Sequence, residues 1–174
     1  MIARRHSAEG TRSEALYSDC ELYRYALTRI WSDEAPRLSF VMLNPSTADE
    51  RRNDPTIARC EARARRAGYG GFRVVNLFAF RATDPRELRR AADPVGPGND
   101  AALAEAVGWA DALLLGWGRH GALAGRGELV ARALRAAGGD LRCLGVNMDG
   151  SPRHPLYVGN AVEFSPFPET LSAV

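Results

Sequence analysis

The chain has 174 residues, of which 45% are hydrophobic and 25% charged, and its formal net charge is +2. This length suits one domain with a complete core, and the composition is ordinary for a soluble protein. No apolar run approaches the ~20 residues that span a bilayer, and no apolar stretch follows Arg4 and Arg5 as it does in a secretory signal, so we expect a cytoplasmic protein without a membrane partner.

The first part of the chain contains a charged segment and two expected strands. Residues 1–15 mix polar and charged side chains without a period, which predicts a flexible N-terminus. Residues 16–174 are expected to form a single α/β domain. Residues 22–31 are rich in aromatic and β-branched side chains and predict an antiparallel edge strand. Residues 38–43 are almost continuously apolar, as expected for a strand that is covered on both faces.

The rest of the chain alternates apolar runs with helix signals. Further strands are predicted at residues 72–80, 112–116 and 141–146. Helices are predicted at residues 56–67, shortly after Asp84-Pro85, at 101–109 after Asn99 or Asp100, and at 128–137. Because alternating strands and helices need crossover connections, we predict a three-layer α/β sandwich with a central, mainly parallel four-stranded sheet and an N-terminal antiparallel edge strand.

Polar residues gather where the predicted strands end, and ligands bind at this edge of an open parallel sheet. The segments concerned are Asn44-Pro45-Ser46, then Asn76 with Phe78 and Arg81, then Trp117 to His120, and finally the loop with His154-Pro155.

Each of these segments also has a purely structural interpretation. Asn44-Pro45 can simply end a strand, since the residue before proline is extended and asparagine suits turns. Asp54 and Asp84 are interpreted as helix caps. Asn76 lies inside an apolar strand, where an unpaired amide costs about 1–3 kcal/mol, so it is either satisfied in the core or reads a ligand. His154, in a loop bracketed by prolines, is either structural or functional.

The remaining signals exclude several kinds of chemistry. The three cysteines are far apart and form neither a disulfide framework nor a zinc motif, so we interpret them as reduced and mostly buried. The sequence contains no nucleotide-binding glycine motif, nucleophile elbow or zinc-protease motif. We therefore predict no metal and no cofactor. Arginines are clustered at positions 63, 65 and 66 and at 86, 89 and 90, and both clusters are interpreted as solvated helix faces.

Taken together, the motifs resemble those of a known family. They are residues 43–49 (LNPSTAD), 53–56 (NDPT), 76–79 (NLFA), 81–85 (RATDP), 93–97 (DPVGP), 99–100 (ND), 116–118 (GWG) and 154–157 (HPLY). The chain resembles the bacterial and phage domain-of-unknown-function family 1643 over about residues 22–166.

That family is in turn distantly similar to the uracil-DNA glycosylase superfamily, whose members carry an Asp-Pro or Asn-Pro, a strand asparagine, a Trp-Gly-x-His or Gly-x-x-Ala element and a His-Pro loop in this order. The resemblance implies a uracil-DNA-glycosylase-like fold with Asn44 and His154 as catalytic residues. Asn44 would orient a water and His154 would stabilise the departing base. Asn76 would read the base, and Phe78 or Trp117 would stack on it. The implied substrate-binding residues are Pro45, Ser46, Asn76, Phe78, Arg81, Trp117 and His120.

Two departures bear on the substrate. The serine that usually follows His-Pro is replaced by Leu156, and no basic stripe accompanies the site. Both favour a nucleotide or single-stranded DNA over duplex DNA. The resulting hypotheses are an enzyme that hydrolyses the N-glycosidic bond of a nucleobase, a non-catalytic nucleotide-binding or nucleic-acid-binding module, and an unrelated small-molecule enzyme.

Overall fold

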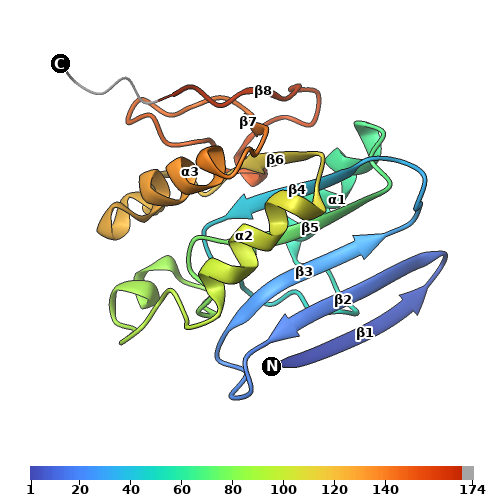
Figure 1. Cartoon of the computed structure of the whole chain (residues 1–174), viewed down its shortest axis with the longest axis horizontal. Coiled ribbons are helices and arrows are strands. Elements are labelled where there is room, and N and C mark those ends of the chain that lie inside the picture. The colour runs from blue at the N-terminus through green and yellow to red at the C-terminus, as the bar shows by residue number, and fades with distance from the viewer. Residues whose placement is uncertain (170–174) are drawn as a thin grey trace.

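The computed structural model describes residues 1–169 and shows one mixed sheet with helices on both faces (Figure 1). The strands are β1 (Ile2–Ala8), β2 (Thr11–Tyr17), β3 (Arg24–Ile30), β4 (Arg37–Met42), β5 (Gly71–Asn76), β6 (Ala112–Leu115), β7 (Leu141–Cys143) and β8 (Ser165–Pro166). The α-helices are α1 (Pro55–Arg66), α2 (Asn99–Trp109) and α3 (Arg126–Ala136). Short 3-10 helices occur at η1 (Pro85–Arg89), η2 (Arg119–Gly125) and η3 (Pro155–Tyr157). No helix in the described part of the chain is long and apolar enough to cross a membrane.

The sheet corrects the predicted fold class. Its eight strands run in the order β1-β2-β3-β5-β4-β6-β7-β8. Four of the seven pairings are antiparallel, and only those of β5 with β4, β4 with β6, and β6 with β7 are parallel. The prediction of a central, mainly parallel four-stranded sheet of the uracil-DNA-glycosylase type, with one edge strand, is therefore wrong.

The difference arises mainly at the N-terminus. Residues 1–15 were expected to be flexible, but β1 and β2 form a hairpin that pairs in register from Ile2 with Tyr17 to Ala8 with Thr11. This hairpin continues the sheet, so β3 lies inside the sheet rather than at its edge. Of the expected domain, residues 170–174 lie outside the described part.

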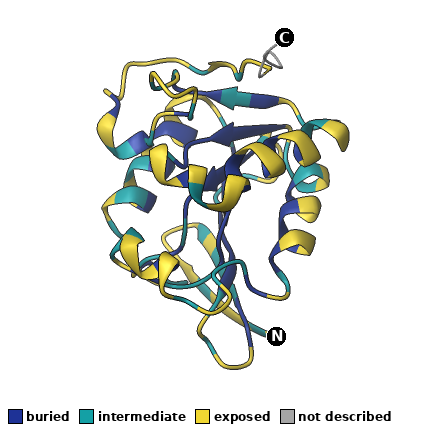
Figure 2. Ribbon diagram, turned by 90° about the vertical axis from the view of Figure 1, so that its left-hand side faces the viewer, coloured by how far each residue is buried: buried dark blue, intermediate teal, exposed yellow. Residues whose placement is uncertain are grey.

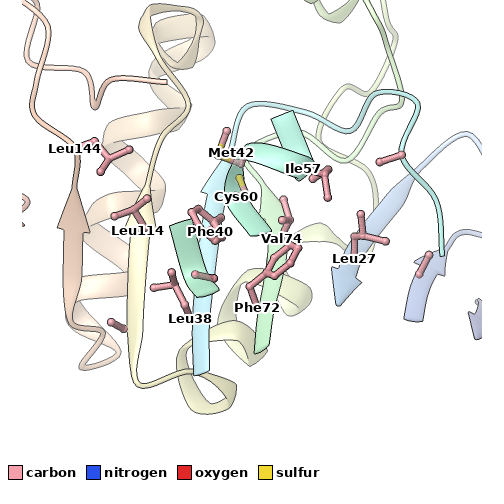
Figure 3. Packing of buried hydrophobic residues seen from close by; sticks show 14 of the residues in the cluster. Leu27, Leu38, Phe40, Met42, Ile57, Cys60, Phe72, Val74, Leu114 and Leu144 are labelled. Carbon is pink, nitrogen blue, oxygen red and sulfur yellow. The ribbon is translucent and has the colours of Figure 1, made fainter. Parts of the chain in front are cut away.

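The core consists of two layers, one on each face of the sheet. On one face, apolar side chains of β4 and β5 such as Phe40 and Phe72 pack with Ile57 and Cys60 of α1 (Figure 3). On the other face, alternate residues of the same strands pack against α2 and α3. Strands β3 to β7 are almost entirely buried, whereas the helices expose one side to solvent (Figure 2). All three cysteines are free; Cys60 and Cys143 are buried, as expected for most of them, and Cys20 is exposed.

Helix starts follow the predicted caps only in part. The Asp54 carboxylate accepts a hydrogen bond from the Ile57 amide at 2.8 Å and caps α1, as predicted. Helix α2, however, follows Gly98 without a side-chain cap. Asn99 is fully buried, and its amide nitrogen donates to the carbonyls of Asn76 and Leu77 at 2.9 and 3.0 Å. The predicted cap thus joins α2 to the end of β5.

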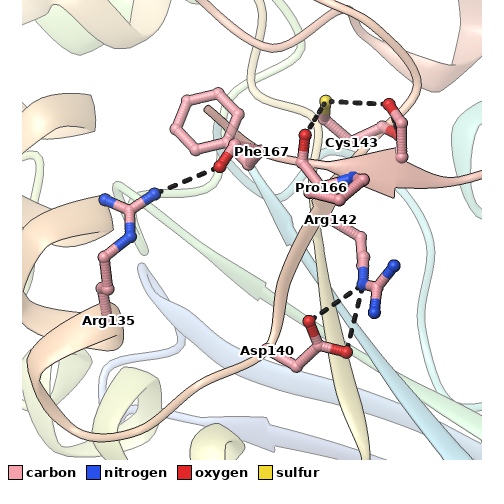
Figure 4. A network of polar contacts seen from close by, with 7 residues as sticks. Arg135, Asp140, Arg142, Cys143, Pro166 and Phe167 are labelled. Atoms are coloured by element: carbon pink, nitrogen blue, oxygen red, sulfur yellow. Dashed lines mark hydrogen bonds and ion pairs between the residues drawn. The ribbon is translucent and has the colours of Figure 1, made fainter. Parts of the chain in front are cut away.

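The C-terminal edge of the sheet is fastened by side chains as well as by the short strand β8. Arg135 of α3 donates to the Phe167 carbonyl, and the Cys143 thiol contacts the Pro166 carbonyl (Figure 4). Arg142 pairs with Asp140 at 2.9 Å beside them. The contacts of Arg135 and Cys143 hold the last described segment against α3 and β7.

Candidate functional site

A cleft of about 530 Å³ lies at the carboxyl ends of β4, β6 and β7. We call it the His154 cleft. Its walls are Leu43 after β4, Pro85 of η1, Trp117, Gly118, Arg119 and His120 after β6, and Asn147, Arg153, His154, Tyr157 and Val158 after β7. The position agrees with the rule that ligands of open α/β sheets bind where the parallel strands end, and the volume lies within the range of small-molecule sites.

The loop that carries His154 is positioned by close packing on β6. A Cβ atom on Gly116 would lie 2.8 Å from Cδ of Pro155 and 3.2 Å from the sulfur of Met42. Only glycine therefore lets Pro155 approach the end of the strand. Behind the loop, Arg63 of α1 donates hydrogen bonds to the carbonyls of Val158 at 2.6 Å and Gly159 at 3.1 Å. The solvated helix face predicted for Arg63 is wrong, since this side chain is buried.

The imidazole of His154 has a defined hydrogen-bonding state. Its Nδ1 accepts a hydrogen bond from the Leu156 amide at 3.2 Å. In the neutral ring the proton therefore lies on Nε2, which is left as the free donor. Burial lowers the pKa of His154, although the charge of Asp54 acts in the opposite direction. Burial therefore favours the neutral imidazole.

This lowered pKa predicts a pH dependence of stability. A histidine whose pKa is lower in the folded protein binds protons more readily after unfolding. Its contribution is present above the unfolded pKa of about 6.5 and is lost as the pH falls through the folded pKa. We expect the melting temperature of the wild type to fall more steeply below pH 6.5 than that of His154→Gln. Thermal unfolding between pH 5 and 8 measures this, and parallel curves for the two proteins would contradict the prediction.

Two further predicted residues reach the cleft in different ways. Trp117 lines it but is 4% exposed. Its indole packs against Gly121 and Gly127, where added Cβ atoms would lie 2.6 and 2.8 Å from Nε1. Trp117 is therefore mainly a core residue that forms the floor of the cleft. His120 is exposed at its rim.

Asn44, Pro45 and Arg81 form a second group, beside the cleft rather than in its lining. The amide nitrogen of Asn44 donates to the carbonyls of Pro45 at 3.0 Å and Ala82 at 2.8 Å. Arg81 donates to the Glu21 carbonyl at 3.1 Å, and its guanidinium lies over the ring of Tyr17. These bonds join the loop after β4 to the segment after β5 and to the turn before β3. Ser46 is partly buried in the same loop.

Asn76 and Phe78 are the predicted residues furthest from solvent, each 1% exposed. Phe78 lies in the core layer beneath α2 and α3, out of reach of a ligand in the cleft. Asn76 ends β5 beside Met42 of β4. Neither atom of its amide has a hydrogen-bond partner among residues 1–169. An unpaired buried amide is costly. The amide of Asn76 is therefore still able to form hydrogen bonds, and it lies one strand away from the cleft residue Leu43.

The predicted site residues do not include four cleft residues with polar side chains: Arg119, Asn147, Arg153 and Tyr157. Tyr157 is the most conspicuous, because its side chain is 84% exposed and its ring centroid lies 5.5 Å from that of His154. Its place three residues after His154, at the end of the short helix η3, was the available signal. Among the described residues, no group of three or more His, Cys, Asp or Glu side chains is arranged to hold a metal ion.

Fold and site together define a mixed α/β protein with a polar cleft at the ends of its parallel strands. Residues 24–156 match the family described as "Protein of unknown function (DUF1643)". Since the match covers more than half of the chain, the protein belongs to this family. Neither the curated proteins nor the solved structures contain a match to the chain.

Proposed function

We propose that the His154 cleft binds a nucleobase-containing ligand and that the protein hydrolyses its N-glycosidic bond. The observation that carries this proposal is the pairing of His154 with Tyr157. The Nε2–H group of His154 is a free donor at the cleft, and the exposed ring of Tyr157 lies beside it. A donor next to an aromatic face suits a planar base, which stacks on the ring and accepts a hydrogen bond at its edge.

The reaction follows from the charge that the base acquires. As the bond between C1′ and the base nitrogen breaks, its electron pair remains on the base, and the oxygen of water bonds to C1′. One water proton stays on the new sugar hydroxyl, and the other ends on the released base. The His154 Nε2–H group would stabilise the developing negative charge. The Asn44 oxygen would orient the water, but an amide cannot remove its proton.

The role proposed for Asn44 is inferred from the resemblance to the uracil-DNA glycosylases. The likeness consists of the order of Asn44-Pro45, Asn76, the Trp117–His120 element and His154-Pro155 along the chain. Asn76 would read the base, for which its unpaired amide provides the capacity. Because Asn76 is buried, this reading requires the loop after β4 to move when the ligand enters. Tyr157 replaces Phe78 and Trp117 as the proposed stacking residue.

A second candidate function is binding of the same ligand without hydrolysis. It is favoured by the absence of acidic side chains from the lining: the cleft residues include no Asp or Glu that would serve as a general base. The two candidates share their ligand and differ only in whether product forms.

The test is a search for released base by mass spectrometry. The full chain is incubated with nucleotides and with single-stranded and double-stranded oligonucleotides containing uracil, hypoxanthine or hydroxymethyluracil, and binding is measured in parallel by calorimetry. We expect release of one base, and a loss of about 100-fold or more in His154→Gln, as for removal of a single donor to a developing charge. His6→Gln is the matched control, because His6 lies in β1 and does not line the cleft.

The outcomes separate the candidates. Base release that depends on His154 supports hydrolysis. Binding without product supports the second candidate and overturns the first. If the folded protein neither binds nor cleaves any member of the panel, both are wrong.

A further inference from the structure

Two arginines of the His154 cleft lack acidic partners. Arg119 follows β6 and Arg153 follows β7, so the two loops bring them to the same cleft. Within residues 1–169, neither guanidinium lies within 4 Å of a carboxylate. By contrast, Arg132 on the neighbouring helix α3 pairs with Glu128 at 2.7 Å. The cleft therefore holds two cations whose charge the described part of the protein leaves uncompensated at close range.

The surroundings of these arginines leave their donors open to a ligand. The Nε atom of Arg153 donates to the Val146 carbonyl at 3.3 Å, which fixes the guanidinium and leaves its two terminal nitrogens free of other partners in the described chain. Hydrogen bonds from Ser151 and the charge of Arg119 lower the pKa of Asp149, but this carboxylate does not line the cleft. Its carboxylate accepts two hydrogen bonds from Ser151, at 3.0 Å from the amide and 2.6 Å from the hydroxyl.

We propose that Arg119 and Arg153 bind the phosphate of a free nucleotide, so that the substrate is a nucleoside phosphate rather than a nucleic acid. This inference rests on the proposed function, which places the base between His154 and Tyr157. Guanidinium groups match the geometry of phosphate oxygens and bind them by paired, charge-assisted hydrogen bonds. In this assignment His154 and Tyr157 hold the base, and Arg119 and Arg153 of the same cleft bind the phosphate.

The number and placement of the cations favour a single nucleotide over a polymer. Two arginines suffice for one phosphate group, whereas nucleic-acid binding commonly engages about 6–10 phosphate contacts. Beyond the rim of the cleft at Pro85, Arg86 is already paired with Asp84 at 2.7 Å, and the exposed Arg89 and Arg90 do not line the cleft. The formal net charge of +2 gives little overall attraction for a polyanion. The volume of about 530 Å³ is that of a small-molecule site.

Calorimetry with matched ligands tests this assignment. The full chain is titrated with nucleosides, the corresponding 5′-monophosphates, inorganic phosphate and a ten-nucleotide single strand. We expect at least one monophosphate to bind 10-fold or more tightly than its nucleoside. In the double variant Arg119→Gln/Arg153→Gln this difference should shrink to within 2-fold, with the nucleoside affinity unchanged. Arg132→Gln, an exposed arginine outside the cleft, should behave as the wild type.

The ligand series distinguishes failure of this inference from failure of the proposed function. Nucleosides that bind as tightly as their monophosphates would overturn the phosphate site and leave the base site standing. A single strand that binds more tightly than every mononucleotide would overturn the choice of a free nucleotide. Inorganic phosphate that binds through the two arginines, with no response to any base, would refute the proposed function and retain an anion site. No binding of any ligand would refute both.

Discussion

Replacing Gly121 with alanine is expected to lower the free energy of unfolding by about 3 kcal/mol, at the upper end of the usual cost of overpacking a core. The added Cβ would overlap Cδ1 of Trp117 and lie 2.6 Å from its Nε1. The indole cannot shift away from residue 121, because it is packed on other sides as well. Gly127 packs against the same ring, and a Cβ atom there would lie 2.8 Å from the same nitrogen. The ring of Phe167 packs edge-on against the indole.

Urea unfolding followed by circular dichroism measures this change. The matched control is Gly108→Ala, because Gly108 lies in α2 with nothing within 4 Å of the added Cβ. That substitution should stabilise the protein by about 0.5–1 kcal/mol, the helix preference of alanine over glycine. If Gly121→Ala were as stable as the wild type, Trp117 would not be packed against residue 121, and the floor of the His154 cleft would have to be different.

The sequence predicts those strands whose burial requires an almost entirely apolar composition. Strands β4 and β6 are buried on both faces, and their continuous apolar runs located them within one or two residues. The hairpin of β1 and β2 has no such apolar run. Most residues of β1 are exposed, and charged side chains such as Arg4, Arg5 and Glu14 interrupt any period. Its pairing depends on backbone hydrogen bonds, which every residue type except proline can make, so the sequence pattern did not predict the larger mixed sheet.

Site residues could be predicted where their position depends only on the end of a strand. They could not be predicted where the direction of the side chain determines whether a residue reaches the cleft. Trp117, His120 and His154 follow parallel strands and reach the same cleft. Asn44 and Phe78 also lie near strand ends, but Asn44 bonds to neighbouring carbonyls and Phe78 turns into the core. Which of several aromatic residues remains exposed depends on the packing around each one, as the exposed ring of Tyr157 shows against the buried ring of Phe78.

Arg63 shows that a helical period can reveal an unexpected role. Ile57, Cys60 and Ala64 form the buried stripe of α1, and Arg63 lies three residues after Cys60 in the same stripe. The spacing to Arg65 and Arg66 suggested a solvated cluster, but the spacing to Cys60 indicated burial. An arginine on a buried stripe needs acceptors, and here the irregular loop after His154 supplies them through its carbonyls.

Replacing Arg63 with alanine is therefore expected to lower the free energy of unfolding by about 3 kcal/mol. The loss has two sources, the unsatisfied carbonyls of Val158 and Gly159 and the space left by the side chain. A buried group deprived of its partner costs about 1–3 kcal/mol, and the cavity adds to this cost. Arg63→Lys, which keeps a charged donor but not the two-pronged geometry, should fall between alanine and the wild type.

Hydrogen exchange shows whether this loss is concentrated in the loop. The amides of Tyr157 and Val158, which donate within the turn that follows His154, should exchange faster in Arg63→Ala, whereas those of β4 should change only with global stability. Arg66→Ala is the control, since Arg66 is exposed one turn further along the same helix, and surface changes of this kind usually stay within about 0.5 kcal/mol. Equal effects of the two substitutions would mean that Arg63 does not hold the loop. A selective effect of Arg63→Ala would mean that α1, on one face of the sheet, sets the position of the His154 imidazole at the strand ends.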